Sequence, residues 1–215
     1  MYYKEYIKTV SKYLVKKINN QYGGNYLTKQ TKLRLPNFFH LETILDHFDT
    51  IHDKNVLEVG VGNGLNGSII LSKLFNLYTG LEPIEHIFNI AEENCKKFEC
   101  DIEFINETIE DFKTDNEYHL IIFKNSIFFT DLDKTIEKID NLLTKDGIVI
   151  IDNPIPKPSG WGSNKLNEDS KEFDPEIWNR RKDELEEVDK VLRNITIFNV
   201  NKHELRRSNI YVLTR

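Results

Sequence analysis

The chain has 215 residues, of which 39% are hydrophobic and 30% are charged, a composition typical of a single globular domain with a sizeable core. Its formal net charge is -6 and its basic residues are scattered among acidic ones, so it lacks the basic face with which proteins bind nucleic-acid phosphates. It shows neither the apolar core of a signal peptide nor an apolar run near the roughly 20 residues that span a bilayer. We therefore expect a cytoplasmic protein without nucleic-acid or membrane partners.

The two cysteines, Cys95 and Cys100, lie close together in the sequence, and no second cluster of Cys or His accompanies them. A structural zinc site would need further ligands of that kind. The sequence therefore predicts no metal at these residues, and two small, partly buried thiols in a reducing cytosol.

Apolar residues at helical spacing mark the first part of the chain. They recur between Tyr3 and Ile18 and again between Phe38 and Phe48, and Gly23-Gly24 separates the two stretches. This spacing predicts two helices, which we treat as a helical cap over residues 1–48.

Short apolar runs alternate with helical patterns from residue 49 to residue 152. Strands are predicted at 56–59, 78–81, 102–105, 120–123 and 148–151. Helices are predicted at 69–75, 83–98 and 132–143, and a turn at 145–147. On the second helix, the packed face is predicted to carry Ile87, Ile90, Ala91, Cys95 and Phe98.

The last part of the chain combines a long loop, a helix and a hairpin. Residues 153–193 begin with a Pro- and Gly-rich loop around Trp161 and continue in a helix whose apolar face carries Trp178, Leu185, Val188 and Leu192. Residues 194–215 are predicted to form two strands, at 195–200 and 210–213. The alternation of strands and helices predicts one α/β domain over residues 1–215, with a doubly wound, mostly parallel sheet that ends in an antiparallel hairpin.

Three glycines at alternate positions follow the first predicted strand and precede a helix. They are Gly60, Gly62 and Gly64. Without Cβ atoms, such a turn can be tight and a ligand can approach its backbone closely. The free N–H groups of the helix N-terminus then face the same ligand. The pattern predicts a binding loop for a small molecule.

The segment from Glu58 to Gly64, which reads E-V-G-V-G-N-G, resembles motif I of the class I S-adenosylmethionine (AdoMet)-dependent methyltransferases. The resemblance implies a seven-stranded sheet with AdoMet across the carboxyl ends of its first two strands. It further implies that Gly60, Gly62, Asn63 and Gly64 wrap the methionine part of the cofactor. Glu58 would orient the loop and the amino group of the ligand.

Other segments extend the resemblance. Glu82, at the end of the second predicted strand, matches the acid that accepts hydrogen bonds from the ribose hydroxyls. Thr108 and Ile109 stand where the family holds the adenine, although Thr108 replaces the usual Asp. Asn125 follows the fourth strand and would face the reaction centre as a cofactor contact.

Asp152 and Lys124 are the candidate catalytic residues. Asp152-Asn153 matches the pair with which catechol-type O-methyltransferases hold Mg²⁺, but Lys124 replaces the further Asp of that site, so we expect no metal. Asp152 is interpreted as a group that orients an acceptor hydroxyl or serves as general base, or else as a loop residue that caps its own turn. Lys124 would lower the pKa of an acceptor or bind an anionic one, unless it merely ends its strand in solvent. Three histidines are further candidate bases, namely His40, His119 and His203.

The resemblance implies methyl transfer from AdoMet to a small-molecule acceptor, either a sugar hydroxyl or an amine, and Trp161 favours a saccharide or another small metabolite. Two alternatives stay open. The run from Gly62 to Gly67 also matches G-x-G-x-x-G, so an NAD(P)-dependent oxidoreductase is one. The other is a non-catalytic AdoMet-fold binding protein. A homodimer is also left open.

Overall fold

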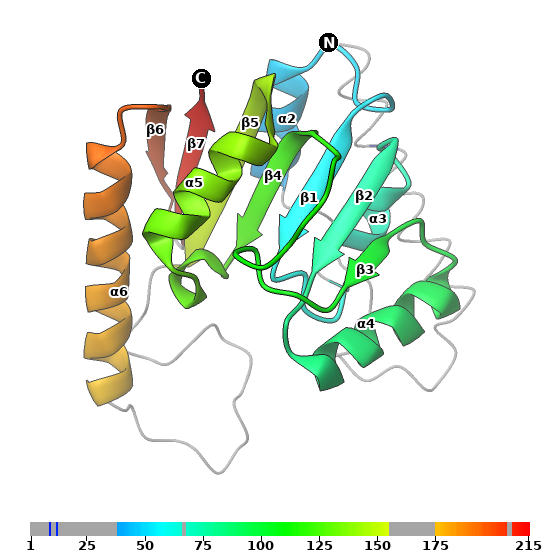
Figure 1. Cartoon of the computed structure of the whole chain (residues 1–215), viewed down its shortest axis with the longest axis horizontal. Helices are drawn as coiled ribbons and strands as arrows, with labels where there is room; N and C mark the ends of the chain where they lie inside the picture. Colours follow the sequence, from blue (N-terminus) through cyan, green and yellow to red (C-terminus); the bar gives the residue numbers. More distant parts are fainter. Residues whose placement is uncertain (1–8, 10–11, 13–37, 66–67, 155–174, 206–207) are drawn as a thin grey trace.

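The computed structural model describes residues 9, 12, 38–65, 68–154, 175–205 and 208–215. Seven strands form one sheet in the order β3-β2-β1-β4-β5-β7-β6 (Figure 1). The strands are β1 (Asn55–Val59), β2 (Leu77–Leu81), β3 (Glu103–Ile105), β4 (Tyr118–Lys124), β5 (Leu143–Pro154), β6 (Asn199–Glu204) and β7 (Ser208–Thr214). The helices are α2 (Phe38–His47), α3 (Ser68–Ser72), α4 (Glu85–Phe98), the short 3-10 helix η2 (Ile127–Phe129), α5 (Leu132–Leu142) and α6 (Pro175–Asn194).

The first five strands run parallel, β7 runs antiparallel to them, and β6 pairs antiparallel with β7 at the edge of the sheet. β1 lies between β2 and β4, while β7 pairs with both β5 and β6 in the opposite direction. The chain therefore moves outward from β1 to β3 and then returns to the other side of β1 to continue with β4. The predicted doubly wound sheet with its terminal hairpin is confirmed, and the reversal beside β1 marks where such sheets bind ligands.

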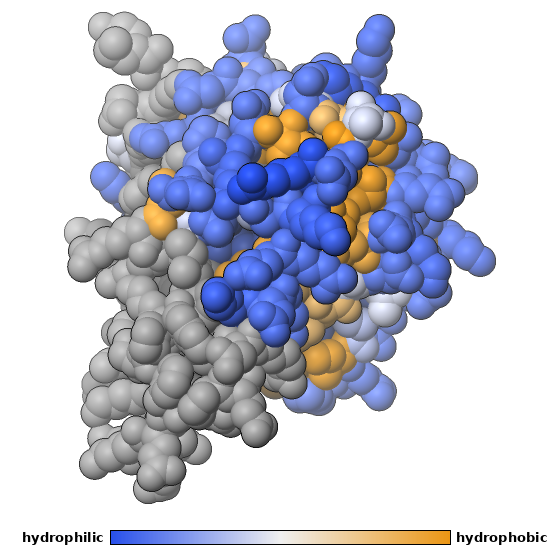
Figure 2. Space-filling view, turned by 90° about the vertical axis from the view of Figure 1, so that its left-hand side faces the viewer, coloured by the Kyte–Doolittle hydropathy of each residue, from blue (hydrophilic) through white to orange (hydrophobic). Residues whose placement is uncertain are grey.

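Helices cover both faces of the sheet, and each face has its own apolar core. On one face, α5 and α6 pack through Ile136, Ile139, Val188 and Leu192. On the other face, α2 and α3 contribute a second cluster that includes Ile44 and Leu71. Because successive residues of a strand point to opposite faces, β4 and β5 supply apolar side chains to both clusters, which explains their unbroken apolar runs. Figure 2 shows the α6 side of the molecule, where hydrophilic side chains cover most of the described surface.

Three details of the sequence-based assignment are wrong. Of the predicted packed face of α4, only Ala91, Cys95 and Phe98 are buried, and Ile90 is exposed. The predicted turn at 145–147 lies inside β5, where a register shift between Tyr118 and Leu120 accommodates the extra residues. The first strand of the hairpin begins at Asn199 rather than at residue 195, since α6 continues to Asn194.

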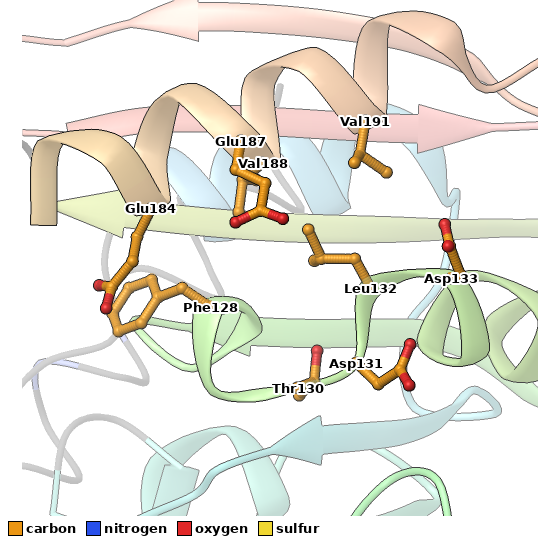
Figure 3. A pocket seen from close by; sticks show the side chains of 9 residues that line it. All are labelled: Phe128, Thr130, Asp131, Leu132, Asp133, Glu184, Glu187, Val188 and Val191. Carbon is orange, nitrogen blue, oxygen red and sulfur yellow. The ribbon is translucent and has the colours of Figure 1, made fainter. Parts of the chain in front are cut away.

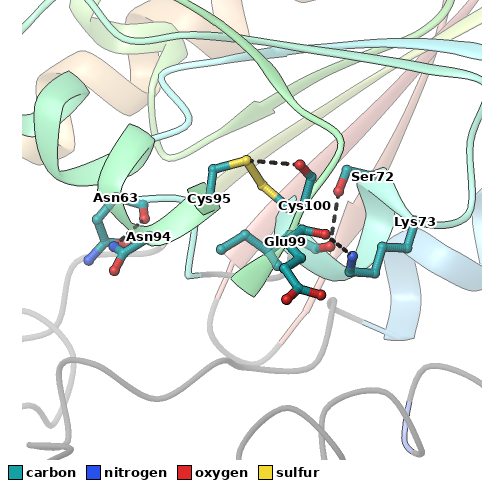
Figure 4. Close-up of a disulfide and its surroundings, with 8 residues drawn as sticks. Asn63, Ser72, Lys73, Asn94, Cys95, Glu99 and Cys100 are labelled. Carbon is teal, nitrogen blue, oxygen red and sulfur yellow. Dashed lines mark hydrogen bonds between the residues drawn. A yellow bond between two sulfur atoms is a disulfide. The ribbon is translucent and has the colours of Figure 1, made fainter. Parts of the chain in front are cut away.

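The predicted free thiols are also wrong in this structure. Cys95 and Cys100 are joined in a disulfide (Figure 4). Glu99 ends α4 in a left-handed conformation and turns the chain back on itself. This turn brings the Cα atoms of the two cysteines to 5.0 Å, a separation that suits a disulfide.

Two predicted segments lie wholly or mostly outside the described residues. In the helix predicted from Tyr3 to Ile18, only Thr9 and Lys12 are described, and both are helical. The loop that carries Trp161 is not described. Within the described part of the chain, no helix is long and apolar enough to cross a membrane.

Candidate functional site

A cavity of about 560 Å³ opens at the carboxyl ends of β1, β2 and β4. Of the residues predicted for the site, those in its lining are Glu58, Gly60, Gly62, Glu82, Thr108, Ile109, Lys124 and Asn125. Asn63, Gly64 and Asp152 do not line it. Most of the predicted cofactor residues therefore meet at one place, although they come from segments far apart in the sequence.

A second hollow lies away from the strand ends, between η2, the start of α5 and α6 (Figure 3). Its volume is about 280 Å³, half that of the larger cavity. Four carboxylates surround it, from Asp131, Asp133, Glu184 and Glu187. It contains none of the residues predicted for the site, so the larger cavity is the candidate site.

The glycine loop folds tightly over the end of β2. The backbone N–H groups of Gly60 and Val61 donate to the carbonyl oxygen of Leu81, at 2.9 and 3.0 Å. Gly60 has a φ of +71° and passes so close to Ser126 that a Cβ at residue 60 would lie 2.6 Å from the Ser126 Cβ. Gly62 has a φ of +60°, and nothing lies within 4 Å of the place for its Cβ. Gly60 is therefore required by close packing, whereas Gly62 leaves space beside the cavity.

Glu82 holds this loop and the start of α4 together. One carboxylate oxygen accepts the N–H of Gly62 at 3.0 Å and the other accepts the N–H of Ile84 at 3.1 Å. The side chain is almost fully buried, yet it forms part of the cavity wall. Each carboxylate oxygen has two lone pairs, so both keep capacity to accept a further hydrogen bond from a ligand.

Glu58 is a buried carboxylate in the same wall. The hydroxyl of Tyr78 donates to one of its oxygens at 2.5 Å, and Nζ of Lys124 lies 3.4 Å from the other. Burial, together with the nearby negative charge of Glu58, raises the pKa of Tyr78 well above its usual value, so this hydroxyl keeps its proton. The carboxylate is thus held between a neutral donor and a cation.

The turn after β3 and several apolar side chains form another part of the cavity wall. The Thr108 hydroxyl donates to the Asp111 carboxylate at 2.9 Å and accepts the N–H of Asp111 at 3.2 Å, so it is already engaged in its own turn. Ile109 is buried, and Ile84 and Phe129 are exposed beside it at the cavity. These side chains offer a flat ring system an apolar surface.

Asn125 links the cavity to β5. It has a left-handed φ of +60°, which asparagine tolerates better than most residues, and its N–H donates to the carbonyl oxygen of Asp152 at 2.8 Å. Such a backbone conformation costs energy and often occurs where a site needs a fixed shape.

Asp152 lies within β5, so the alternative of a loop aspartate that caps its own turn is wrong. Its carboxylate lies 3.0 Å from Nε2 of His40 on α2, and both side chains are largely buried. In the β4–β5 register, Asp152 stands opposite Lys124. His40 and Asp152, both singled out in the sequence, are therefore partners, and neither is part of the cavity lining, whereas Lys124 is.

The remaining histidines do not reach the cavity lining. Nδ1 of His119, at the start of β4, accepts the N–H of Asn55 at 3.2 Å, which places it at the opposite end of the sheet. His203 lines a separate groove between α2 and the terminal hairpin. Across the described residues, no group of three His, Cys, Asp or Glu side chains is arranged to hold a metal ion.

The sequence did not single out three residues that shape the site. These are Tyr78, Ile84 and Phe129. Their contacts join separate segments and leave no local pattern. Ser126, which the resemblance places with Lys124 and Asn125 after the fourth predicted strand, does line the cavity. It donates to the carbonyl oxygen of Val59 at 2.5 Å and packs against Gly60.

The order of the seven strands, the glycine loop after β1 and the acids at the ends of β1 and β2 together define the class I methyltransferase fold. Residues 51–206 match a family model described as a methyltransferase domain. The chain belongs to this family.

Similar proteins agree with this assignment. The ubiquinone biosynthesis O-methyltransferase of Rickettsia bellii is 26% identical over 82 residues, which are 38% of this chain and 34% of that protein. The match therefore spans only about a third of the length of the curated relative.

Solved structures show the same fold at low sequence identity. A protein of Staphylococcus aureus assigned as a caffeoyl-CoA O-methyltransferase aligns over 100% of both chains, with a TM-score of 0.62 and 14% identity. One of Methanococcus maripaludis, assigned as AdoMet-dependent, aligns over 99% of this chain and 91% of its own, with a TM-score of 0.61 and 20% identity. An rRNA methylase of Streptococcus thermophilus aligns over 82% and 95%, with a TM-score of 0.58 and 14% identity.

Proposed function

We propose that this methyltransferase binds AdoMet in the cavity at the carboxyl ends of β1, β2 and β4, and transfers its methyl group to a small molecule, either a sugar hydroxyl or an amine. The placement of Glu82 carries the proposal. Its buried carboxylate is fixed by two backbone N–H groups in the cavity wall, where it can accept both hydroxyls of a ribose.

The other residues of the wall fit the remaining parts of the cofactor. Glu58 offers a negative charge to the ammonium of the methionyl end, and Gly60 and Gly62 let that end approach the backbone. Ile109, with Ile84 and Phe129, offers apolar surface to the adenine. Thr108 contributes through its backbone, because its hydroxyl is engaged with Asp111.

Methyl transfer from a sulfonium is an in-line displacement, so the protein mainly has to hold the acceptor atom and the methyl group in line. A hydroxyl acceptor must also lose its proton. We assign this task to Asp152, which His40 orients from α2. The sequence suggests that Lys124 acts on the acceptor together with Asp152. In the structure, its ammonium lies beside Glu58 in the proposed cofactor cavity.

The acceptor class rests on indirect support. The match to a ubiquinone O-methyltransferase favours a small acceptor. An rRNA methylase shares the fold, so the case against a nucleic-acid acceptor rests on the net charge of -6 alone. We also propose a cytoplasmic location.

Calorimetric titration of the purified protein with AdoMet, S-adenosylhomocysteine and NADPH tests the cofactor. Micromolar binding of the two adenosyl ligands alone supports the proposal and justifies an acceptor screen that begins with sugars. Binding of NADPH alone would replace it with an oxidoreductase. Binding of AdoMet without turnover on any acceptor, including RNA, would point to the non-catalytic alternative.

A further inference from the structure

An acidic and a basic side chain stand next to each other in the wall of the cavity. Nζ of Lys124 lies 3.4 Å from Oε1 of Glu58, and both residues line the cavity. Glu58 pairs with Ile122 in the β1–β4 register, so Lys124, two residues further on, points to the same face of the sheet. Lys124 thus lies one residue beyond the last β1–β4 pair, Val59 and Phe123, and lines the cavity.

The carboxylate of this pair is fixed, whereas the ammonium is less enclosed. Tyr78 holds the second oxygen of Glu58 at 2.5 Å, and the Glu58 side chain is 2% exposed. Lys124 is 19% exposed and has a longer, more flexible side chain. On its other side, Asp152 stands opposite it in β5. The wall therefore presents a rigid negative charge beside an adjustable positive one.

An α-amino acid carries the complementary arrangement, an ammonium and a carboxylate on one carbon atom. We propose, on the basis of the AdoMet site inferred above, that Lys124 binds the α-carboxylate of the methionyl end of the cofactor while Glu58 receives its α-ammonium. Lys124 is then a residue that determines cofactor specificity. It selects a complete amino-acid group over an adenosyl thioether without one, and it does not act on the acceptor.

Three ligands separate the two charges. S-Adenosylhomocysteine carries both the ammonium and the carboxylate, its decarboxylated analogue keeps only the ammonium, and 5′-methylthioadenosine has neither. Each is titrated calorimetrically into the wild type and into Lys124→Met, with Lys96→Met as the matched control. Lys96 is 77% exposed on α4, so its replacement makes the same charge change away from the cavity.

Lys124→Met should weaken the binding of S-adenosylhomocysteine by at least about tenfold, because one charge-assisted hydrogen bond is lost. The decarboxylated analogue should bind equally well or more tightly, because Glu58 loses a competing cation. Methylthioadenosine should be unaffected, and Lys96→Met should leave all three affinities unchanged. Lys124→Arg, which keeps the cation, should retain most of the affinity for S-adenosylhomocysteine, and it replaces the Met variant if that one does not fold.

Several results would overturn the inference. If Lys124→Met weakens the binding of all three ligands equally, the lysine only supports the structure of the cavity wall. An unchanged affinity for S-adenosylhomocysteine would mean that Lys124 does not contact the carboxylate. If the wild type binds S-adenosylhomocysteine, either result removes the inference and leaves the proposed cofactor intact. A wild type that binds none of the three ligands removes both.

Discussion

Glu82 joins two segments of the cavity wall. Its carboxylate accepts one N–H from Gly62 and another from Ile84, so it sets the distance between the glycine loop and the start of α4. The carboxamide of Asn106 also donates to the backbone oxygen of Glu82 at 2.8 Å. One residue thereby determines the width of the proposed ribose site.

Glu82→Ala should weaken AdoMet binding by roughly 100-fold, because two hydrogen bonds from the ribose to a charged acceptor are lost. Calorimetry measures the affinity, and circular dichroism checks that the variant is folded. Glu85→Ala, an equal charge change at an exposed residue three positions further along, should bind as the wild type does. Undiminished affinity in Glu82→Ala would remove Glu82 from the site.

Gly62→Val should abolish measurable AdoMet binding. A β-branched side chain at a φ of +60° costs roughly 1–2 kcal/mol of stability, and it would occupy the open space beside the cavity. Gly62→Ala adds a single carbon atom and should have a smaller effect in the same titration. A valine variant that folds and still binds would mean that the loop does not enclose the ligand.

At the residue scale, the sequence predicts the place of a site residue where a local motif contains it. Glu58 is the next-to-last residue of β1 and Glu82 directly follows β2, and the carboxyl ends of neighbouring parallel strands meet at one edge. The pairing of His40 with Asp152 joins positions more than a hundred residues apart, through the packing of α2 on β5. No spacing in the sequence carries that information.

At the scale of elements, α4 connects the cofactor cavity to the disulfide. Its first turn follows Glu82, and near its end Asn94 donates to the backbone oxygen of Asn63 in the glycine loop at 2.9 Å (Figure 4). Cys95, the next residue, ties the last turn of the helix to Cys100. A hydrogen bond thus attaches the helix to the glycine loop, and the disulfide links its last turn to the residue that follows Glu99.

Reduction of the disulfide should lower the stability of the protein by about 2 kcal/mol, since the bond closes a short loop between residues five positions apart. Urea unfolding with and without dithiothreitol measures the difference. The double variant Cys95→Ser/Cys100→Ser should unfold at one urea concentration under both conditions. A wild type that is insensitive to the reductant would show that the bond does not contribute to stability.

Element boundaries were predicted well where apolar runs are bounded by polar residues, as for β1 and β2. They were predicted poorly at the start of β5. Lys145, Asp146 and Gly147 have the composition of a turn, yet they lie within β5, between Leu143, which pairs with Tyr118, and Ile148, which pairs with Leu120. The pairings on both sides of this bulge involve a strand about 25 residues earlier in the chain, and the local residues do not encode them.

At the scale of the whole molecule, the proposed site depends on the sheet remaining intact, because its walls come from β1, β2, β4 and the turns that follow them. A ligand that binds only the folded chain stabilises all of it. S-Adenosylhomocysteine at about 100 times its Kd should add about 2.7 kcal/mol, and so raise Tm by about 5–10 °C for a chain of this size. Scanning calorimetry tests this, with Glu82→Ala as a variant whose shift should be only about 1–2 °C, because its Kd is expected to be about 100 times higher.

The contact between Gly60 and Ser126 limits how this protein can change over evolutionary time. A Cβ at residue 60 would lie 2.6 Å from the Ser126 Cβ, so residue 60 cannot gain a side chain while residue 126 keeps its own. An alanine at residue 60 would be tolerated only beside a glycine at residue 126, and it would still carry the strain of a positive φ. Any side chain at residue 60 should therefore appear only together with a glycine at residue 126, and libraries that diversify the residues around the cavity should leave Gly60 fixed.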